Sequence, residues 1–81
     1  MEQEQIKDLV LKIAQALVDR PEKVSVNEID SGNTVIYELT VSEDDMGKIL
    51  GKRGRNADAI RTILGAIAGQ IRKRLRLEII E

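Results

Sequence analysis

The segment Gly51-Lys52-Arg53-Gly54 is the part of the chain whose residue types could do chemistry. Glycine lets the backbone adopt dihedral angles that other residues avoid, and it lets the backbone of another molecule come close. The two cations between the glycines add positive charge. The segment is therefore suited to hold the phosphates of a phosphodiester backbone, although an ordinary basic turn between two helices would have the same composition.

Two expected helices must position this turn. A short helix is expected over residues 42–50, where Ser42 and Asp45 have the approximate spacing of a capping box. A longer helix is expected over residues 56–73, with Asn56 as its N-cap. The start of the longer helix adds N–H groups and a partial positive charge beside the turn, which favour an anion. The apolar residues at helical spacing in this second helix are Ala57, Ile60, Leu64, Ile67 and Ile71.

The rest of the chain completes one small domain over residues 1–81. An amphipathic helix is expected over residues 3–19, ended by Pro21, and a strand begins at Lys23. A second, alternating strand spans residues 34–41, and the last strand contains residues 75–79. The order α–β–β–α–α–β predicts an α+β fold with a three-stranded mixed sheet and three helices on one face. The first two strands should form an antiparallel hairpin, and the last should return parallel to the second through a right-handed crossover.

Composition argues against an enzyme. The chain has no cysteine and no histidine, so it lacks a thiolate nucleophile, a thiolate metal ligand and the commonest acid–base catalyst. Residues 47–52 resemble a shortened Walker motif, but the spacer and the following Ser or Thr are missing. Asp44 and Asp45 could suggest a metal site, but acids at a helix start favour the helix dipole. We therefore expect no cofactor, no metal, no small-molecule substrate and, without a membrane-spanning apolar run, a cytoplasmic protein.

The net charge of −1 hides a strong polarity along the chain. Residues 1–47 carry four cations and eleven acids, a balance of −7. Residues 48–76 carry nine cations and one acid, Asp58, a balance of +8. Such a concentration of positive charge indicates a site for a polyanion. The alternative is that the charged helix faces neutralise each other in the fold.

A resemblance to a known family adds to this reading. The element order, with a G-x-x-G turn between the last two helices, resembles a type II KH domain, in which this turn clamps single-stranded nucleic acid. The run of residues 45–55, Ala57 and residues 59–62 are similar to the KhpA (YlqC) family of small bacterial single-KH proteins, as are residues 17–21 and 77–80. Many KH domains have a large aliphatic residue where this chain has Ala57, and the small residue also resembles this family. The resemblance covers essentially the whole chain.

The resemblance implies an RNA site made by the turn and an apolar groove beside it. The implied RNA-binding residues are Lys48, Ile49, Leu50, Gly51, Lys52, Arg53, Gly54, Arg55, Ile60 and Arg76, with Arg74 as an alternative to Arg76 at the far wall. The alternative for Ile49 and Ile60 is that they are plain core residues. Tyr37, the only aromatic residue, is expected in the core, so an aromatic platform for base stacking is not expected.

The resemblance also implies a function and partners. It implies an RNA chaperone for single-stranded RNA, linked to cell shape and cell division, that pairs with a second copy or with a larger KhpB/Jag protein. Gly65 and Gly69, one helical turn apart beside Arg61, suggest a close helix–helix contact in a dimer. Alternatively, these glycines bend the helix or relieve crowding. The rival function is a protein-interaction module of KH fold whose RNA contact is incidental.

Overall fold

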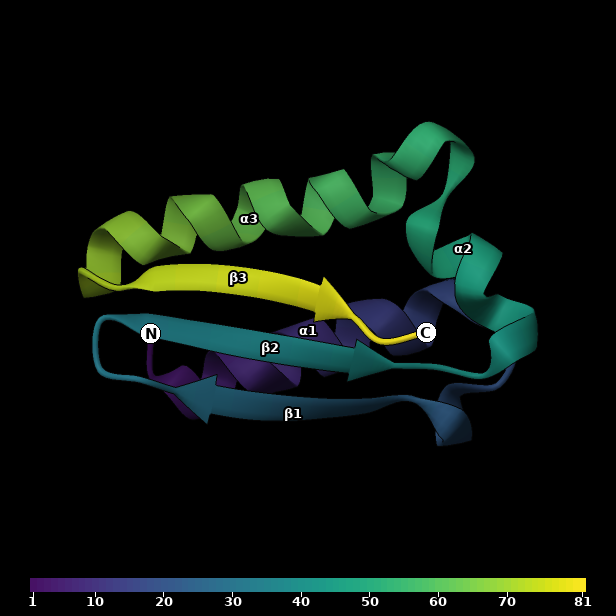
Figure 1. Ribbon diagram of the computed structural model, residues 1–81, viewed down its shortest axis with the longest axis horizontal. Helices are drawn as coiled ribbons and strands as arrows, with labels where there is room; N and C mark the ends of the chain where they lie inside the picture. The colour runs from purple at the N-terminus through teal and green to yellow at the C-terminus, as the bar shows by residue number, and fades with distance from the viewer.

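The computed structural model describes residues 1–81 and has the predicted order of helices and strands (Figure 1). Three single 3₁₀ turns, η1, η2 and η3, lie between the longer elements. The elements are α1 (Gln3–Leu17), η1 (Pro21–Lys23), β1 (Ser25–Asp30), β2 (Thr34–Thr40), η2 (Glu43–Asp45), α2 (Met46–Leu50), η3 (Lys52–Gly54), α3 (Arg55–Ile71) and β3 (Arg74–Ile79). The glycine turn is therefore η3 with Gly51 before it.

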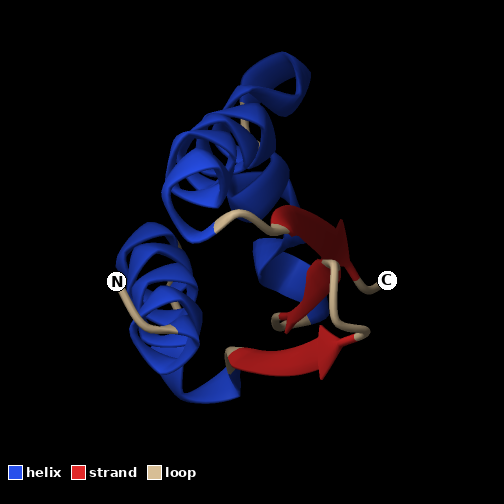
Figure 2. Cartoon of the chain, turned by 90° about the vertical axis from the view of Figure 1, so that its left-hand side faces the viewer, coloured by secondary structure: helices blue, strands red, loops and turns tan.

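The sheet has the predicted topology. Its strand order is β1-β2-β3, with β1 antiparallel to β2 and β2 parallel to β3. Tyr37 in the central strand stands opposite Glu28 on one side and Leu77 on the other. Figure 2 shows the helices on one side of the three strands, so the mixed sheet with helices on one face is confirmed. Strand β3 is an edge strand, and α3 packs beside it.

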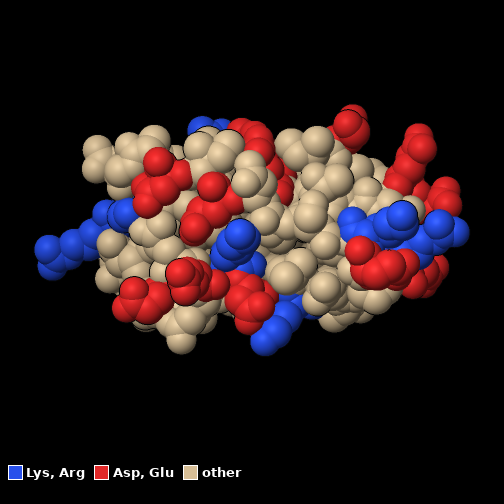
Figure 3. Space-filling view, turned by 90° about the horizontal axis from the view of Figure 1, so that it is seen from below, with Lys and Arg blue, Asp and Glu red and all other residues tan.

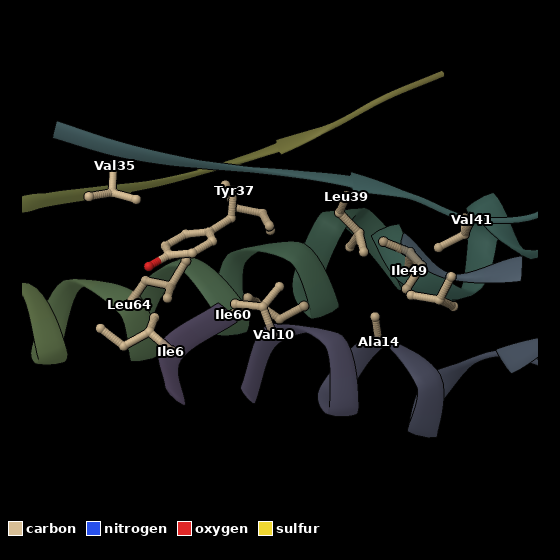
Figure 4. Close-up of a cluster of buried hydrophobic side chains, with 12 residues drawn as sticks. Ile6, Val10, Ala14, Val35, Tyr37, Leu39, Val41, Ile49, Ile60 and Leu64 are labelled. Atoms are coloured by element: carbon tan, nitrogen blue, oxygen red, sulfur yellow. The ribbon is translucent and has the colours of Figure 1, made fainter. Parts of the chain in front are cut away.

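The core lies between the sheet and the helices. Every second residue of β2 points into it, because successive side chains of a strand alternate between faces. Figure 4 shows these side chains meeting those of α1 and α3. Tyr37 is fully buried, as predicted, and burial raises the pKa of its hydroxyl well above the usual value. The buried cluster is Ile6, Val10, Ala14, Val24, Val35, Tyr37, Leu39, Val41, Ile49, Ile60, Leu64 and Leu77.

Asp45 does not form the predicted capping box. Its carboxylate instead accepts hydrogen bonds from the backbone N–H groups of Asp19 at 3.2 Å and Arg20 at 3.0 Å, and its side chain is buried. The acid thus holds the segment after α1 against α2. The prediction was wrong because a carboxylate can satisfy any nearby N–H, and spacing along the chain shows only the local ones.

Several element boundaries differ from the predicted ones, among them the start of the short helix α2 at Met46 instead of residue 42. Strand β1 begins at Ser25, because residues 21–23 form the turn η1 first. Helix α1 ends at Leu17, where the next residue is extended. Helix α3 ends at Ile71, because Arg72 adopts a left-handed conformation with φ 57°. None of the helices combines the length and the apolarity needed to span a membrane.

Candidate nucleic-acid interface

The glycine turn is built from a run of backbone conformations with positive φ. Gly51 has φ 74° and Gly54 has φ 75°, and Arg53 between them has φ 59°. The N–H of Gly51 donates to the carbonyl oxygen of Gly47 at 2.9 Å, and the N–H of Gly54 donates to that of Gly51 at 3.1 Å. The two glycine N–H groups are thus used inside the turn. Any backbone N–H group that binds a phosphate at this turn is therefore that of another residue.

Asn56 fastens the turn rather than capping α3. Helix α3 begins at Arg55 with Gly54 as its N-cap, so the predicted N-cap was wrong. The side-chain Nδ2 of Asn56 donates to the carbonyl oxygen of Lys48 at 2.8 Å. A Cβ atom at Gly51 would lie 2.6 Å from the Cγ of Asn56, whereas one at Gly54 would meet nothing within 4 Å. Close approach and positive φ together therefore require glycine at position 51.

Three cations around the turn are free of ion pairs. Lys52, Arg53 and Arg55 are exposed, and none of them lies within 4.0 Å of a carboxylate oxygen. A left-handed conformation costs a residue with a Cβ about 1–2 kcal/mol, and Arg53 adopts one. The turn therefore presents positive charge without an acidic partner to solvent, and its backbone has an unfavourable conformation at Arg53.

Lys48 differs from these cations. Its ammonium group pairs with the carboxylate of Asp19 and lies 3.8 Å from that of Asp45. The hydrogen bond to Asp19 raises the pKa of Lys48, so the ammonium stays charged but is balanced within the fold. Lys48 therefore joins α2 to the segment after α1, and it is not one of the free charges that a phosphate would meet.

The aliphatic residues assigned to the RNA groove are mostly core. Ile49 is 0% exposed and Ile60 is 2% exposed. Figure 4 shows both side chains pointing into the core. They support the turn and α3 from beneath, and direct contact with a base does not fit this structure. Leu50, at the end of α2, is half-buried and keeps part of its surface open.

A hollow of about 560 Å³ runs along β3 on the side of α3. Arg61 overhangs it, with Nη2 3.4 Å from the carbonyl oxygen of Leu77 and Nη1 3.6 Å from a carboxylate oxygen of Asp58. Arg76, an expected RNA residue, is exposed and lines the hollow. Arg61 was predicted at a dimer contact, and its place at this hollow was not predicted. The sequence does show that Arg61 lies next to the core-facing side of α3, because it follows Ile60. It does not show that β3 packs on that side, which only the folded topology reveals.

The positive charge of residues 48–76 is not neutralised by the fold. Of its nine cations, only Lys48, Arg61 and Lys73 make ion pairs. Figure 3 shows acidic groups spread over the underside, where α1 and β1 lie, and basic side chains projecting at the left-hand end. The alternative that the charged faces cancel each other is therefore wrong for most of these cations.

The two glycines of α3 lie on its exposed side. A Cβ atom at Gly65 or at Gly69 would meet nothing within 4 Å, so neither glycine relieves crowding inside the chain. Ile63, on the same helix, is 43% exposed. This part of α3 is open to another molecule, and the dimer contact stays a prediction.

Comparison with known proteins places this arrangement in a family. The family model described as KhpA/KhpB, KH domain, matches residues 7–79. A protein of Caldanaerobacter subterraneus subsp. tengcongensis, named RNA-binding protein KhpA, is 52% identical over 73 residues, covering 90% of this chain and 97% of its own length. Relatives with the same name in Clostridium perfringens (51% identical, 93% of this chain, 100% of the relative) and Chlamydia caviae (47%, 94% and 97%) are similar.

Two solved structures share the fold. Both are of Era, one a variant from Aquifex aeolicus bound to GDP.AlF4−, with TM-score 0.62, and one in complex with MgGDPNP and nucleotides 1506–1542 of 16S ribosomal RNA, with TM-score 0.57. They are 18% and 22% identical to this chain, and each match covers 93% of it. The chain corresponds to 29% and 30% of the respective Era chains, so the likeness concerns one part of Era and its fold alone.

Proposed function

Because the chain belongs to the KhpA/KhpB KH-domain family, we propose that it binds single-stranded RNA without a catalytic step. The relatives that it matches are named RNA-binding proteins. The observation that carries the proposal is the set of three unpaired cations, Lys52, Arg53 and Arg55, around a turn that requires Gly51. Surface charge without an acidic partner is what a phosphate-binding turn needs.

The proposed mechanism divides the work between the turn and the hollow beside β3. The cations of the turn hold phosphates and fix the position of the strand. Bases enter the hollow, where Arg61, Arg76 and Glu78 offer polar contacts and the aliphatic residues of β3 offer apolar surface. A KH groove of this kind holds roughly four nucleotides. No aromatic side chain is exposed, so base stacking on a platform plays no part.

A single groove of this size binds RNA weakly. We therefore propose that two domains pair, so that both bind the same RNA strand and raise the overall affinity. The exposed side of α3 at Gly65 and Gly69 lets a second helix approach closely, because glycine has no side chain to keep it away. The partner would be a second copy or a KhpB-type chain. The two glycine turns of such a pair would bind one RNA strand and favour its refolding, which is the activity of an RNA chaperone. We propose that this takes place in the cytoplasm.

The RNA site is tested by reversing its charge. The variant Lys52→Asp/Arg53→Asp should lose RNA binding in fluorescence anisotropy, while its circular dichroism and thermal midpoint stay near those of the parent, because exposed turn residues contribute little to stability. Lys7→Asp/Lys12→Asp on α1 is the control with the same change in net charge. Equal RNA affinity in parent and turn variant would remove the turn as the site and favour the rival protein-interaction module.

The pairing is tested separately. Gly65→Leu should leave a folded protein with a monomeric mass in light scattering, and it should weaken binding to long RNA. Ala16→Leu, on the exposed side of α1, is the control for added apolar surface. A parent protein that is monomeric at high concentration would exclude this homodimer.

A further inference from the structure

Five of the six unpaired cations of residues 48–76 form two groups at opposite ends of α3, and the sixth, Arg76, lies along β3. The first group is the turn with Lys52, Arg53 and Arg55. The second follows the other end of the helix, in Arg72 and at the start of β3 in Arg74, both exposed and free of ion pairs. Helix α3 has 17 residues, so the groups lie about 25 Å apart. Figure 1 shows α3 running the length of the molecule between them.

A path connects the two groups along the edge strand. A second hollow of about 400 Å³, lined by Ala68, Arg74, Leu75 and Arg76, shares Leu75 and Arg76 with the hollow under Arg61. The surface between α3 and β3 is thus hollowed from Arg61 towards Arg74. The hollow at the opposite end of β3 contains Glu43 and Glu81 and would repel phosphates. The hollows towards Arg74 hold one acid, Glu78, beside the three cations Arg61, Arg74 and Arg76, so their charge favours a polyanion on this path.

Each of the two groups of cations contains one arginine with a strained backbone conformation. Arg53 and Arg72 are the two residues other than glycine that have positive φ in this chain. Glycine or asparagine would adopt this conformation more easily. The neighbouring Lys73 is used within the fold, where it contacts Asp30 at 3.3 Å and Gln3 at 2.6 Å. The side chain of Arg72 makes no such contact, and its charge serves the fold only through the dipole at the C-terminal end of α3.

We propose that the bound RNA strand continues from the glycine turn along α3 and β3 to a second phosphate site at Arg72 and Arg74. This inference rests on the proposed function and extends its footprint. At the rise of about 3.4 Å per nucleotide of a helically stacked strand, 25 Å corresponds to about seven nucleotides, so a tetranucleotide in that conformation at the turn does not reach the far site. The far site would hold the strand without reading its bases, because phosphate contacts carry no sequence information directly.

RNAs of two lengths distinguish the contribution of the second phosphate site from that of the glycine turn. Anisotropy titrations with a uridine tetranucleotide and a uridine dodecanucleotide compare the parent with Arg72→Gln/Arg74→Gln and with the control Lys7→Gln/Lys12→Gln. One phosphate contact on a single strand contributes about fivefold at 0.1 M salt. The double variant should therefore bind the dodecanucleotide on the order of 20-fold more weakly, with a salt slope smaller by about 1.4. Its binding of the tetranucleotide should not change.

Single substitutions at position 72 separate charge from backbone strain. Arg72→Gly should raise the urea midpoint and lower the affinity for the dodecanucleotide about fivefold, whereas Arg72→Lys should keep most of the affinity. Native mass spectrometry at a one-to-one ratio checks that a single chain binds the strand. Unchanged dodecanucleotide affinity in Arg72→Gln/Arg74→Gln, or an equal loss for both RNA lengths, would overturn the second site. Insensitivity of both lengths to Lys52→Asp/Arg53→Asp would instead overturn the turn as the first site.

Discussion

The side chain of Asn56 and the carbonyl oxygen of Lys48 are joined by a hydrogen bond of 2.8 Å. This bond connects the first turn of α3 to α2 and so spans the glycine turn between the two helices. Without it, only the backbone hydrogen bonds of Gly51 and Gly54 would hold the four residues between the two helices. The bond is therefore a reason why the free cations of the turn have fixed positions.

Asn56→Ala should loosen the turn. Loss of one hydrogen bond lowers the free energy of unfolding by about 1 kcal/mol, and a less ordered turn should bind RNA more weakly. Amide hydrogen exchange of residues 51–55 and RNA titration measure the two effects. Asn27→Ala is a matched control, because it also removes an asparagine hydrogen bond, to Glu38 at 3.0 Å in the sheet. Equal exchange at the turn in both variants would contradict the bridging role.

Alanine should be less tolerated at Gly51 than at Gly54. Both substitutions place a Cβ on a backbone with positive φ, which costs about 1–2 kcal/mol, but only the Cβ at Gly51 would also collide with Asn56. Urea unfolding should therefore give a larger loss for Gly51→Ala. Part of the difference should disappear in the Asn56→Ala background, since the two residues are in contact. Equal losses at the two glycines would show that the contact with Asn56 is unimportant.

Asp45 should be a main stabiliser of the segment after α1. Asp45→Ala leaves the N–H groups of Asp19 and Arg20 without their acceptor, and hydrogen bonds to a charged group contribute about 1.5–3 kcal/mol each. We expect a loss of about 3 kcal/mol in chemical denaturation, and a smaller loss for Asp45→Asn, which keeps one acceptor oxygen. Asp44→Ala, at an exposed neighbour, should change stability by less than about 0.5 kcal/mol. Similar losses for the two alanine variants would refute this assignment.

Stability in acid should depend on Asp30. Hydrogen bonds from the side chain of Gln3 and the N–H of Gly32 lower the pKa of Asp30 below its ordinary value of 3.8. Since the folded-state pKa is the lower one, this stabilisation is complete above pH 3.8 and is lost as the pH falls through the folded-state value. Asp30→Asn should therefore lose less stability than the parent in that range, as measured by urea midpoints at several pH values. Asp44→Asn, whose side chain makes no such hydrogen bond, should follow the parent.

The sequence predicts the helices, strands and topology well because their signals are local. Alternating apolar residues in β2 and helical spacing in α3 require no knowledge of distant partners. The same signals cannot show that Asp45 binds N–H groups 25 and 26 residues away or that Lys48 pairs with Asp19. Periodicity also shows that Ile60 faces inward, but it cannot separate the core from the floor of a groove. Long-range pairing therefore decides which members of a correctly located basic segment stay free.

The parallel pairing of β2 with β3 joins Thr34 to Arg74, which are forty residues apart, whereas Asp30 and Val35 close the β1–β2 hairpin over five. Three doublings of loop length add about 2 kcal/mol of closure entropy, so the attachment of β3 is the least local joint of the sheet. RNA bound between α3 and β3 would contact both elements and stabilise the attachment of β3 to the sheet. By mass action, ligand that binds only the folded chain raises its melting temperature. RNA bound at the proposed site would therefore also help to keep the domain folded.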